Sequence, residues 1–196
     1  MVTTALNARS ASLNPGGSGD IAACVPMDGF HLTRAQLSAL PDPATAHARR
    51  GAEFTFDGAA FLKLVQAIRL PSGPASPIIY APSFDHAVKD PVADSIPISP
   101  AHRVVVFEGN YVVLDKEPWR TAAGLMDERW FVEVDFNVAR ARLAKRHVAA
   151  GIVTNEQDGY RRADENDLLN GKDIVRLRLN VDEIVVSRED GQWAAW

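Results

Sequence analysis

Two apolar runs in this sequence each end in an acidic residue followed by a glycine. The run at residues 21–27 leads into Asp28, and the run at residues 104–107 leads into Glu108. Two carboxylates at one place could bind Mg²⁺, which prefers oxygen ligands, and one of them could take the proton of a substrate hydroxyl. The two acids are therefore the first candidates for a catalytic or metal site.

Each acid also has a simpler interpretation. Glu108 could lie in solvent at the end of its strand. Asp28 could cap a helix over residues 32–40, because aspartate is favoured at helix N-caps. The pattern alone leaves both interpretations open.

A basic helix supplies the next candidates. Arg142 and Arg146 are four residues apart in a predicted helix over residues 137–150. Their side chains share one face and could converge on a phosphate. A solvated charged face is the simpler interpretation, and the spacing by itself favours it.

A loop between prolines carries two more polar groups. Asp85 and His86 lie in a predicted loop over residues 81–91. Loops on a rigid scaffold often carry binding residues. His86 taken alone is more often an ordinary surface histidine.

The elements that must position these groups alternate along the chain. Alternation of strands and helices predicts an α/β fold, with a mainly parallel sheet covered by helices. Ligands of such sheets bind beyond the carboxyl ends of the strands, where Asp28, Glu108 and Tyr111 lie. The expected strands are residues 21–27, 78–80, 104–107, 129–135 and 182–187, and the expected helices are residues 1–13, 32–40, 58–70, 119–126, 137–150 and 155–170.

Three segments have more specific expectations. Residues 104–107 are all apolar, which predicts a strand buried on both faces. Residues 41–57 are predicted to be irregular. The tail at residues 191–196 is predicted to fray or to pack through its tryptophans.

Composition narrows the class of protein. The chain has 196 residues, of which 46% are hydrophobic and 23% are charged. We therefore expect one compact domain. A formal net charge of −4 argues against nucleic-acid and anionic-membrane partners. Arg9 lies among serines and threonines before the first acid, Asp20, which leaves a mitochondrial presequence open.

Five ordered blocks resemble the phosphoribulokinase/uridine kinase family of P-loop kinases, in the branch that includes pantothenate kinase and fructose-transport-associated kinases. The resemblance runs from about residue 22 to residue 187. The blocks are VPMDGFHL at residues 25–32, RRG at 49–51 with FD at 56–57, YAPSFDH at 80–86, VVFEGNY at 105–111 and RARLAKR at 140–146.

The resemblance implies a three-layer P-loop NTPase-like fold and a kinase that uses ATP and Mg²⁺. Asp28 matches the acid that accepts the proton of the substrate hydroxyl and helps to organise magnesium, and Glu108 matches the Walker B acid. Arg142 and Arg146 match arginines of the helix leading into the lid, where they neutralise the transferring phosphoryl group.

The remaining blocks imply an acceptor pocket. The residues that fall in these blocks are His31, Arg50, Asp85, His86 and Tyr111. A nucleoside, a pantothenate-like molecule or a sugar would each suit the same catalytic acid. We expect a cytoplasmic protein with a small-molecule substrate, and a homodimer is left open.

The sequence departs from this family at its beginning. Members start with a strand, a Gly-x-x-x-x-Gly-Lys-Ser/Thr loop and a helix, whereas residues 1–13 match only the end of that helix. In the family, the first strand lies between the strands that match residues 104–107 and 129–135. Two hypotheses follow. The chain belongs to an ATP-dependent small-molecule kinase, or it is a catalytically inactive kinase-like remnant that acts as a binding or regulatory module.

Overall fold

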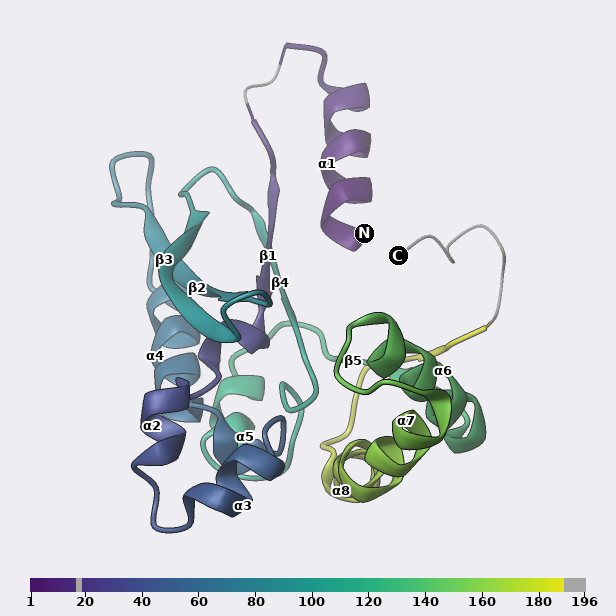
Figure 1. Cartoon of the computed structure of the whole chain (residues 1–196). Helices are drawn as coiled ribbons and strands as arrows, with labels where there is room; N and C mark the ends of the chain where they lie inside the picture. The colour runs from purple at the N-terminus through teal and green to yellow at the C-terminus, as the bar shows by residue number, and fades with distance from the viewer. Residues whose placement is uncertain (17–18, 189–196) are drawn as a thin grey trace. The chain divides into compact units, whose positions relative to one another are not determined.

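The chain folds into two compact units (Figure 1). The computed structural model describes residues 1–16 and 19–188. The first unit comprises Met1–Val112 and Lys116–Leu125, and the second comprises Val113–Asp115 and Met126–Trp196. The expectation that the whole chain is one compact domain stays a prediction. The expectation for the tail at residues 191–196 falls outside the described residues.

Helices and strands alternate in both units, which confirms the α/β class. The first unit contains α1 (Val2–Leu13), β1 (Ala22–Pro26), the 3₁₀ helix η1 (Met27–Phe30), α2 (Arg34–Ser38), α3 (Pro43–Ala48), the 3₁₀ helix η2 (Glu53–Thr55), α4 (Gly58–Arg69), β2 (Ile79–Asp85), β3 (Asp90–Ile98), β4 (Val104–Glu108) and α5 (Trp119–Ala123). The second contains β5 (Trp130–Glu133), α6 (Phe136–Ala149), α7 (Glu156–Arg162), the π-helical segment η3 (Ala163–Asp167), α8 (Leu168–Leu177) and β6 (Glu183–Val186).

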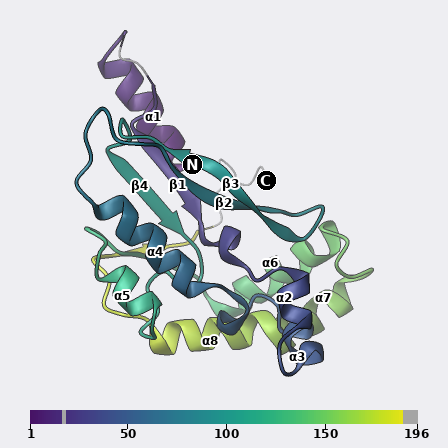
Figure 2. The same ribbon diagram turned by 90° about the vertical axis from the view of Figure 1, so that its left-hand side faces the viewer.

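The two strands that end in acids are neighbours. β1 and β4 pair in parallel, with Ala22 opposite Val104 and Pro26 opposite Glu108. α4 lies beside this pair in Figure 2, and its Phe61 ring packs edge-on against Phe107 of β4 at a centroid distance of 5.5 Å. The predicted parallel sheet therefore has its acid-bearing strands side by side.

Aromatic rings form the core of the first unit. Phe61 of α4 and Trp119 of α5 are both fully buried, and their ring centroids are 5.3 Å apart. Phe30 packs edge-on against Phe61, also at 5.3 Å. Asp57 caps α4, because its carboxylate accepts a hydrogen bond from the Ala60 N–H at 2.8 Å. Aspartate is among the preferred residues at this position of a helix.

Each acid is followed by a glycine at a position where a Cβ atom would overlap another part of the first unit. A Cβ atom on Gly29 would lie 2.2 Å from the carbonyl oxygen of Pro82 in β2. A Cβ atom on Gly109, where φ is +150°, would lie 2.1 Å from Cγ of Met27. Both turns are therefore packed against other parts of the first unit, and neither is a free surface loop.

Asn7 ties α1 to the start of β1. Its side-chain oxygen accepts hydrogen bonds from the N–H groups of Ile21 (3.1 Å) and Ala22 (2.9 Å), and its amide nitrogen donates to the Ala22 carbonyl at 3.0 Å. The predicted helix at residues 1–13 is confirmed, although none of its residues is buried. Its attachment to β1 depends on this polar contact more than on apolar packing.

Three sequence predictions for the middle of the first unit were wrong. The predicted irregular segment at residues 41–57 contains α3, which Asp42 caps, and η2. The predicted loop at residues 81–91 is instead a hairpin, in which β2 pairs antiparallel with β3. The short helix α2 is capped by Thr33 and not by Asp28, which contradicts the capping interpretation of Asp28.

β4 is less buried than its apolar run predicted. Val104 is 38% exposed, and the next three residues are only half-buried. In the ranges that the structure describes, β4 pairs with β1 alone and β5 pairs with β6 alone. Each of these two strands consequently has one edge without a strand partner there, which explains the incomplete burial.

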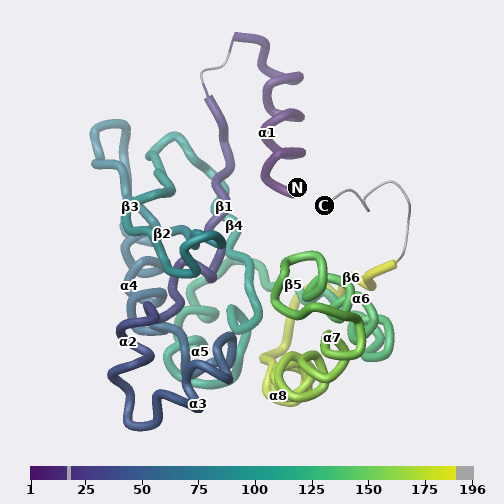
Figure 3. The backbone as a smooth tube through the Cα atoms, in the orientation of Figure 1, coloured from purple at the N-terminus to yellow at the C-terminus, as the bar shows by residue number. Residues whose placement is uncertain are grey.

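The helices of the second unit pack around polar side chains. Figure 3 traces the backbone of this unit. β5 and β6 are parallel, and α6 contacts α7 and η3. His147 of α6 is only 5% exposed, and its Nε2 lies 2.8 Å from Oδ2 of Asp167 in η3. Asn166 and Asn170 are also buried. The predicted helix at residues 155–170 is thus three consecutive helical segments that continue to Leu177.

The new methyl group of a Gly29→Ala variant would overlap the Pro82 carbonyl. We predict that this substitution destabilises the protein by about 1–3 kcal/mol. Urea unfolding followed by tryptophan fluorescence measures the change. Gly73→Ala is the control, because no atom lies within 4 Å of its Cβ position. We expect the control to change stability by no more than about 0.5 kcal/mol. Equal stabilities of the two variants would contradict the packing described for η1.

Candidate functional site

Asp28 and Glu108 lie at the same edge of the β1–β4 pair. β4 ends at Glu108 opposite Pro26, and Asp28 follows two residues later in η1. The Asp28 side chain is 51% exposed, and Glu108 is also exposed, so a ligand can reach both carboxylates. The structure thus places together the two acids that the sequence predicted to be neighbours.

The two carboxylates influence one another. The pKa of Glu108 is raised, mainly because its carboxyl group is partly buried and also because Asp28 carries a negative charge nearby. A divalent cation would relieve this repulsion, and Mg²⁺ typically uses one or two protein carboxylates together with phosphate oxygens and water. Asp28 and Glu108 form a pair of carboxylates that could hold magnesium. The part of the chain that the structure describes contains no cluster of three or more metal-binding side chains.

His31 lies beside Asp28 in the same turn. Its Nδ1 is 2.9 Å from the Asp28 carbonyl oxygen and 3.8 Å from the Asp28 carboxylate. The imidazole ring packs against Phe56 at 4.0 Å and against Phe84 at 4.8 Å between centroids. Burial lowers the pKa of His31, and the contact with Asp28 opposes this shift only in part.

Arg50 and Tyr111 are held by contacts within the first unit. Arg50 donates hydrogen bonds to the carbonyl oxygens of Lys89 (2.6 Å) and Leu32 (3.0 Å), and it pairs with Asp90 at 3.2 Å. Tyr111 is 2% exposed, and its hydroxyl donates to the Gly51 carbonyl at 2.8 Å. Arg50 lies over the Phe84 ring and Tyr111 packs against Phe56, and these are the two rings that contact His31. The predicted role of Arg50 and Tyr111 in substrate binding stays a prediction.

Asp85 is the last residue of β2, and His86 is the first residue of the turn that leads to β3. The Asp85 carboxylate accepts hydrogen bonds from the N–H groups of Val88 (3.1 Å) and Ala87 (2.8 Å), which lower its pKa. His86 is exposed, and its ring is 5.2 Å from Phe84. The Asp85 carboxylate therefore stabilises the turn. The His86 ring lies next to Phe84 and is exposed to solvent.

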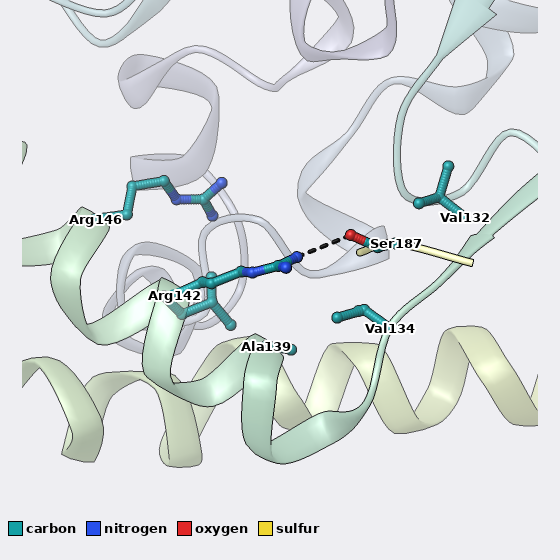
Figure 4. Close-up of a pocket in the computed structure, with 7 residues that line it drawn as sticks. Val132, Val134, Ala139, Arg142, Arg146 and Ser187 are labelled. Carbon is teal, nitrogen blue, oxygen red and sulfur yellow. Dashed lines mark hydrogen bonds between the residues drawn. The ribbon is translucent and has the colours of Figure 1, made fainter. Parts of the chain in front are cut away.

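The second unit contains a pocket of about 250 Å³ between β5, α6 and the residue after β6 (Figure 4). Its apolar lining comes from two valines of the β5 segment and two residues of α6, and its polar lining comes from two arginines and a serine. The lining residues are Val132, Val134, Ala139, Arg142, Leu143, Arg146 and Ser187. The shared face predicted for Arg142 and Arg146 is confirmed.

Ser187 is a site residue that sequence reasoning missed. Arg142 donates a hydrogen bond from Nη1 to the Ser187 hydroxyl at 2.8 Å, as Figure 4 shows. The Ser187 N–H in turn donates to the carbonyl oxygen of Glu133 at 2.8 Å. A serine at the end of a predicted strand carries no special signal, and only the parallel pairing of β5 and β6 brings it to Arg142.

The predicted site residues thus fall into two groups. The first unit holds both acids, His31, the braced Arg50 and Tyr111, and the hairpin turn. The second unit holds the pocket with Arg142 and Arg146. The chemistry of the first group suits proton removal and cation binding, and that of the second suits an anion with an apolar part.

Comparison with known proteins decides the family. The chain is 57% identical over 167 residues to the ATP-dependent kinase-like protein notR′ of Aspergillus versicolor, an alignment that covers 85% of this chain and 95% of that protein. It is 36% identical over 200 residues to the ATP-dependent kinase YFH7 of Saccharomyces cerevisiae, covering 87% of this chain and 57% of YFH7. No protein-family model matches the chain.

Solved structures agree. The crystal structure of YFH7, described as a P-loop-containing kinase with a circular permutation, matches 87% of this chain and 59% of its own with a TM-score of 0.78 at 36% identity. A candidate fructose transport system kinase from Silicibacter matches 93% of this chain and 81% of its own with a TM-score of 0.77 at 32% identity. The chain belongs to the phosphoribulokinase/uridine kinase family of P-loop kinases.

Membership of the phosphoribulokinase/uridine kinase family confirms the resemblance and the P-loop NTPase-like fold. Phosphoribulokinase from Rhodobacter spheroides, at 14% identity and a TM-score of 0.51, shares the fold. The chain covers 63% of a candidate uridine kinase from Schizosaccharomyces pombe, to which it is 44% identical over 151 residues. It therefore spans less than two thirds of that relative and of YFH7. The sequence has no Gly-Lys-Ser/Thr loop.

We predict that Glu108→Gln stabilises the protein at neutral pH and that the gain disappears in acid. The folded-state pKa of Glu108 is raised. The protonated form of Glu108 contributes stability that is fully present below the ordinary glutamate pKa. This stability is lost as the pH rises through the raised pKa, and a glutamine, which does not ionise, avoids the loss. The gain should stay below about 1 kcal/mol because the side chain is exposed.

Urea unfolding between pH 4 and pH 8 measures this difference. Asp28→Asn is the matched background, because it removes one of the two causes of the raised pKa. The gain from Glu108→Gln should be smaller in that background. A gain that is independent of pH, or unchanged by Asp28→Asn, would contradict the proximity of the two acids.

Proposed function

We propose that this chain is the substrate-binding and catalytic part of an ATP-dependent kinase that transfers a phosphoryl group to the alcohol group of a small molecule. Nucleosides, sugars and pantothenate-like molecules are the acceptor classes that we expect. The names of the relatives support a kinase, since notR′ and YFH7 are both described as ATP-dependent kinases or kinase-like.

The observation that carries this proposal is the pair of exposed acids at one strand edge. Asp28 and Glu108 come from adjacent parallel strands, and the pKa of Glu108 responds to Asp28. Phosphoryl transfer to an alcohol needs one group that accepts the hydroxyl proton and another that helps to hold a cation near the phosphates. Two carboxylates with these different environments fit the two tasks.

Asp28 is the group to accept the proton. Its side chain is half-exposed at the start of η1, within reach of a substrate hydroxyl. Glu108, whose pKa is raised by burial and by Asp28, gains most from a neighbouring cation. Mg²⁺ would supply charge neutralisation of the phosphate groups, and Asp28 and Glu108 would be the residues that hold it.

The pocket of the second unit is the proposed place for part of the nucleotide. Val132, Val134 and Leu143 offer apolar contact to a flat ring. Arg142 and Arg146 offer charged donors to an anion. Arg142 is already oriented by its hydrogen bond to the Ser187 hydroxyl at 2.8 Å. Little side-chain freedom therefore remains to be lost on binding.

An inactive binding module is the second candidate function, because the sequence lacks the phosphate-binding loop of an active P-loop kinase. A Gly-Lys-Ser/Thr loop normally holds the nucleotide phosphates by backbone N–H groups and a lysine. These 196 residues contain no such loop. The alternative is a kinase-like module that binds the same ligands without phosphoryl transfer. ADP formation from ATP in the presence of hydroxyl-bearing acceptors separates the two functions.

The partners and location are part of the proposal. We propose a small-molecule substrate, no nucleic-acid or membrane partner, a cytoplasmic location and a homodimer as the assembly to test first. None of the helices in residues 1–16 and 19–188 combines the length and the apolar character that crossing a membrane requires.

We predict that Asp28→Asn lowers kcat for ADP formation by about 10²–10⁴-fold, because asparagine cannot accept the hydroxyl proton. Steady-state kinetics with ATP, Mg²⁺ and the acceptor measures this loss, and thermal unfolding checks that the variant is folded. Asp20→Asn is the control, because it removes a carboxylate just before the start of β1 and should retain activity. Wild-type activity in the Asp28 variant would refute the assignment.

We predict that ATP with Mg²⁺ raises Tm and that Arg142→Ala weakens ATP binding by about tenfold to a hundredfold, the loss of one charged hydrogen-bonding group. Calorimetric titration gives the dissociation constants. Lys145→Ala is the matched control, because Lys145 is on the same helix with the same charge but does not line the pocket. Equal effects of the two variants would mean that helix charge, and not the pocket, binds ATP.

A further inference from the structure

Ser187 carries the hydroxyl group of the pocket in the second unit. Arg142 donates a hydrogen bond from Nη1 to the Oγ atom of Ser187 at 2.8 Å. A guanidinium group has donors and no acceptor, so Oγ accepts in this contact and keeps its own hydrogen. A group that replaced this hydrogen would therefore begin within reach of the Arg142 guanidinium.

The neighbouring strands hold Ser187 at this place. β6 pairs with β5 up to Val186, which lies opposite Glu133. The Ser187 N–H then donates to the Glu133 carbonyl oxygen at 2.8 Å. Figure 4 shows the resulting hydrogen bond from Arg142 to the Ser187 hydroxyl inside the pocket. The register of the β5–β6 pair thus determines where the hydroxyl lies.

The surroundings of the Ser187 hydroxyl suit a dianion. Arg146 lies one turn after Arg142 on α6 and lines the same pocket, whose volume is about 250 Å³. The other lining residues are apolar, and no carboxylate is among them. Arginine pairs with phosphate oxygens through two parallel donors, which makes such contacts strong. A phosphate group on Oγ would therefore meet cationic donors and no opposing charge from the lining.

The segment around Ser187 can be reached by another protein. All four residues of β6 are exposed, including Val186 at 57%, and Arg188 is exposed as well. The β5–β6 ladder has only four residue pairs. Short, exposed ladders open locally at a small cost in free energy. Opening would present the Ser187 hydroxyl to an enzyme, and closing would return it to the pocket.

We propose that Ser187 is the phosphorylation site of a protein kinase, and that the phosphoserine occupies the pocket and closes it to the nucleotide. This inference rests on the proposed function and adds regulation to the same site. Oγ attacks the γ-phosphorus of ATP bound to the protein kinase and forms an O–P bond. The bond from that phosphorus to the bridging oxygen breaks, and its electron pair leaves with ADP. The hydroxyl proton passes to a carboxylate base of the protein kinase.

The residues that follow Ser187 indicate the kind of protein kinase. The sequence continues as Arg188, Glu189 and Asp190, and residues 183–186 before it contain no basic side chain. Acids at the second and third positions after the serine are complementary in charge to a substrate groove lined by basic residues. We therefore expect an acid-directed protein kinase.

The added charge explains the effect on the pocket. A phosphate monoester brings about −1.5 to −2 charges at neutral pH and three acceptor oxygens. Arg142 can then form charge-assisted hydrogen bonds to the phosphoserine. A nucleotide phosphate would meet this negative group in the pocket, and the repulsion lowers its affinity. The unmodified chain binds the nucleotide, and the modified chain does not.

The first test measures ATP binding by calorimetric titration of the full chain with phosphoserine genetically encoded at position 187. We expect the affinity to fall at least about tenfold relative to the unmodified chain. Phosphoserine at position 95 is the control, because Ser95 is an exposed residue of β3 in the first unit. The control should bind ATP within about threefold of the unmodified chain. Equal losses at the two positions would overturn the proposal, because the pocket would then have no special role.

A second measurement needs no nucleotide and separates this inference from the proposed function. We expect phosphoserine at position 187 to raise Tm in the absence of ATP, since it adds charge-assisted hydrogen bonds. The gain should be largely lost in the Arg142→Ala background and kept in the Lys145→Ala background, because Lys145 does not line the pocket. If the unmodified chain binds no ATP, the nucleotide role of the pocket fails, while this comparison still decides whether phosphoserine pairs with Arg142. A gain that survives Arg142→Ala refutes the pairing.

The third measurement asks whether the folded chain is modified. The full chain is incubated with ATP, Mg²⁺ and casein kinase 2, a protein kinase that prefers acidic substrates, and its peptides are analysed by mass spectrometry. We expect phosphate on Ser187, and the Ser187→Ala variant identifies any other modified residue. Asp190→Asn should lower the rate of modification about tenfold or more, because it removes one of the two acids that the groove would bind. A folded chain in which Ser187 stays unmodified, or a rate that Asp190→Asn leaves unchanged, would overturn the proposal.

Discussion

The parallel register between β1 and β4 is the constraint on which the candidate site depends. Because Pro26 is opposite Glu108, the chain leaves both strands at the same level, and the two acids follow at one edge. A one-residue shift of either strand would turn every side chain of that strand to the opposite face of the sheet. The register is in turn supported by Phe61, which packs on Phe107 of β4 and on Phe30 just beyond β1.

The turns after the strands explain why the same acid-glycine pattern occurs twice. Gly29 lets the chain pass against the Pro82 carbonyl, and Gly109 lets it pass against the side chain of Met27, which is 1% exposed. The Tyr111 N–H also lies 3.3 Å from the Met27 sulfur. The acids are therefore presented by two turns packed around one buried methionine, so that their positions depend on the core and not on loop flexibility.

The sequence predicted most of what depends on local periodicity and capping. The helix at α4 and the shared face of Arg142 and Arg146 both follow from spacing that a helix enforces, and the N-cap of α4 is an aspartate, which is among the residues preferred there. The β2–β3 hairpin was missed because prolines argue against strands. This two-stranded ribbon nevertheless accommodates Pro82, Pro91 and Pro97 around an irregular register near Ala81. The helix α3 was missed because it is only six residues long and begins with proline after Asp42.

Contacts between distant residues were beyond the reach of sequence patterns. The pairing of Ser187 with Arg142 spans 45 positions, and the support of Arg50 by Asp90 spans 40. Both depend on which strands and turns become neighbours, and no local signal encodes that. The contact between His31 and Asp28 is different. The two residues are only three positions apart, but the approach of the imidazole to the Asp28 carbonyl depends on the 3₁₀ geometry of η1, which the Asp-Gly pattern does not specify.

The division of charge between the two units bears on mechanism. The first unit presents two carboxylates at its strand edge, and its nearby Arg50 is engaged by Asp90 and two carbonyl oxygens. Such an edge would repel a polyphosphate unless a cation intervened. The pocket of the second unit has the opposite character, with two arginines above an apolar lining and no carboxylate among its lining residues. Under the proposed kinase function, deprotonating an alcohol and holding a nucleotide need opposite electrostatic environments, and the two environments found here come from separate pairs of strands.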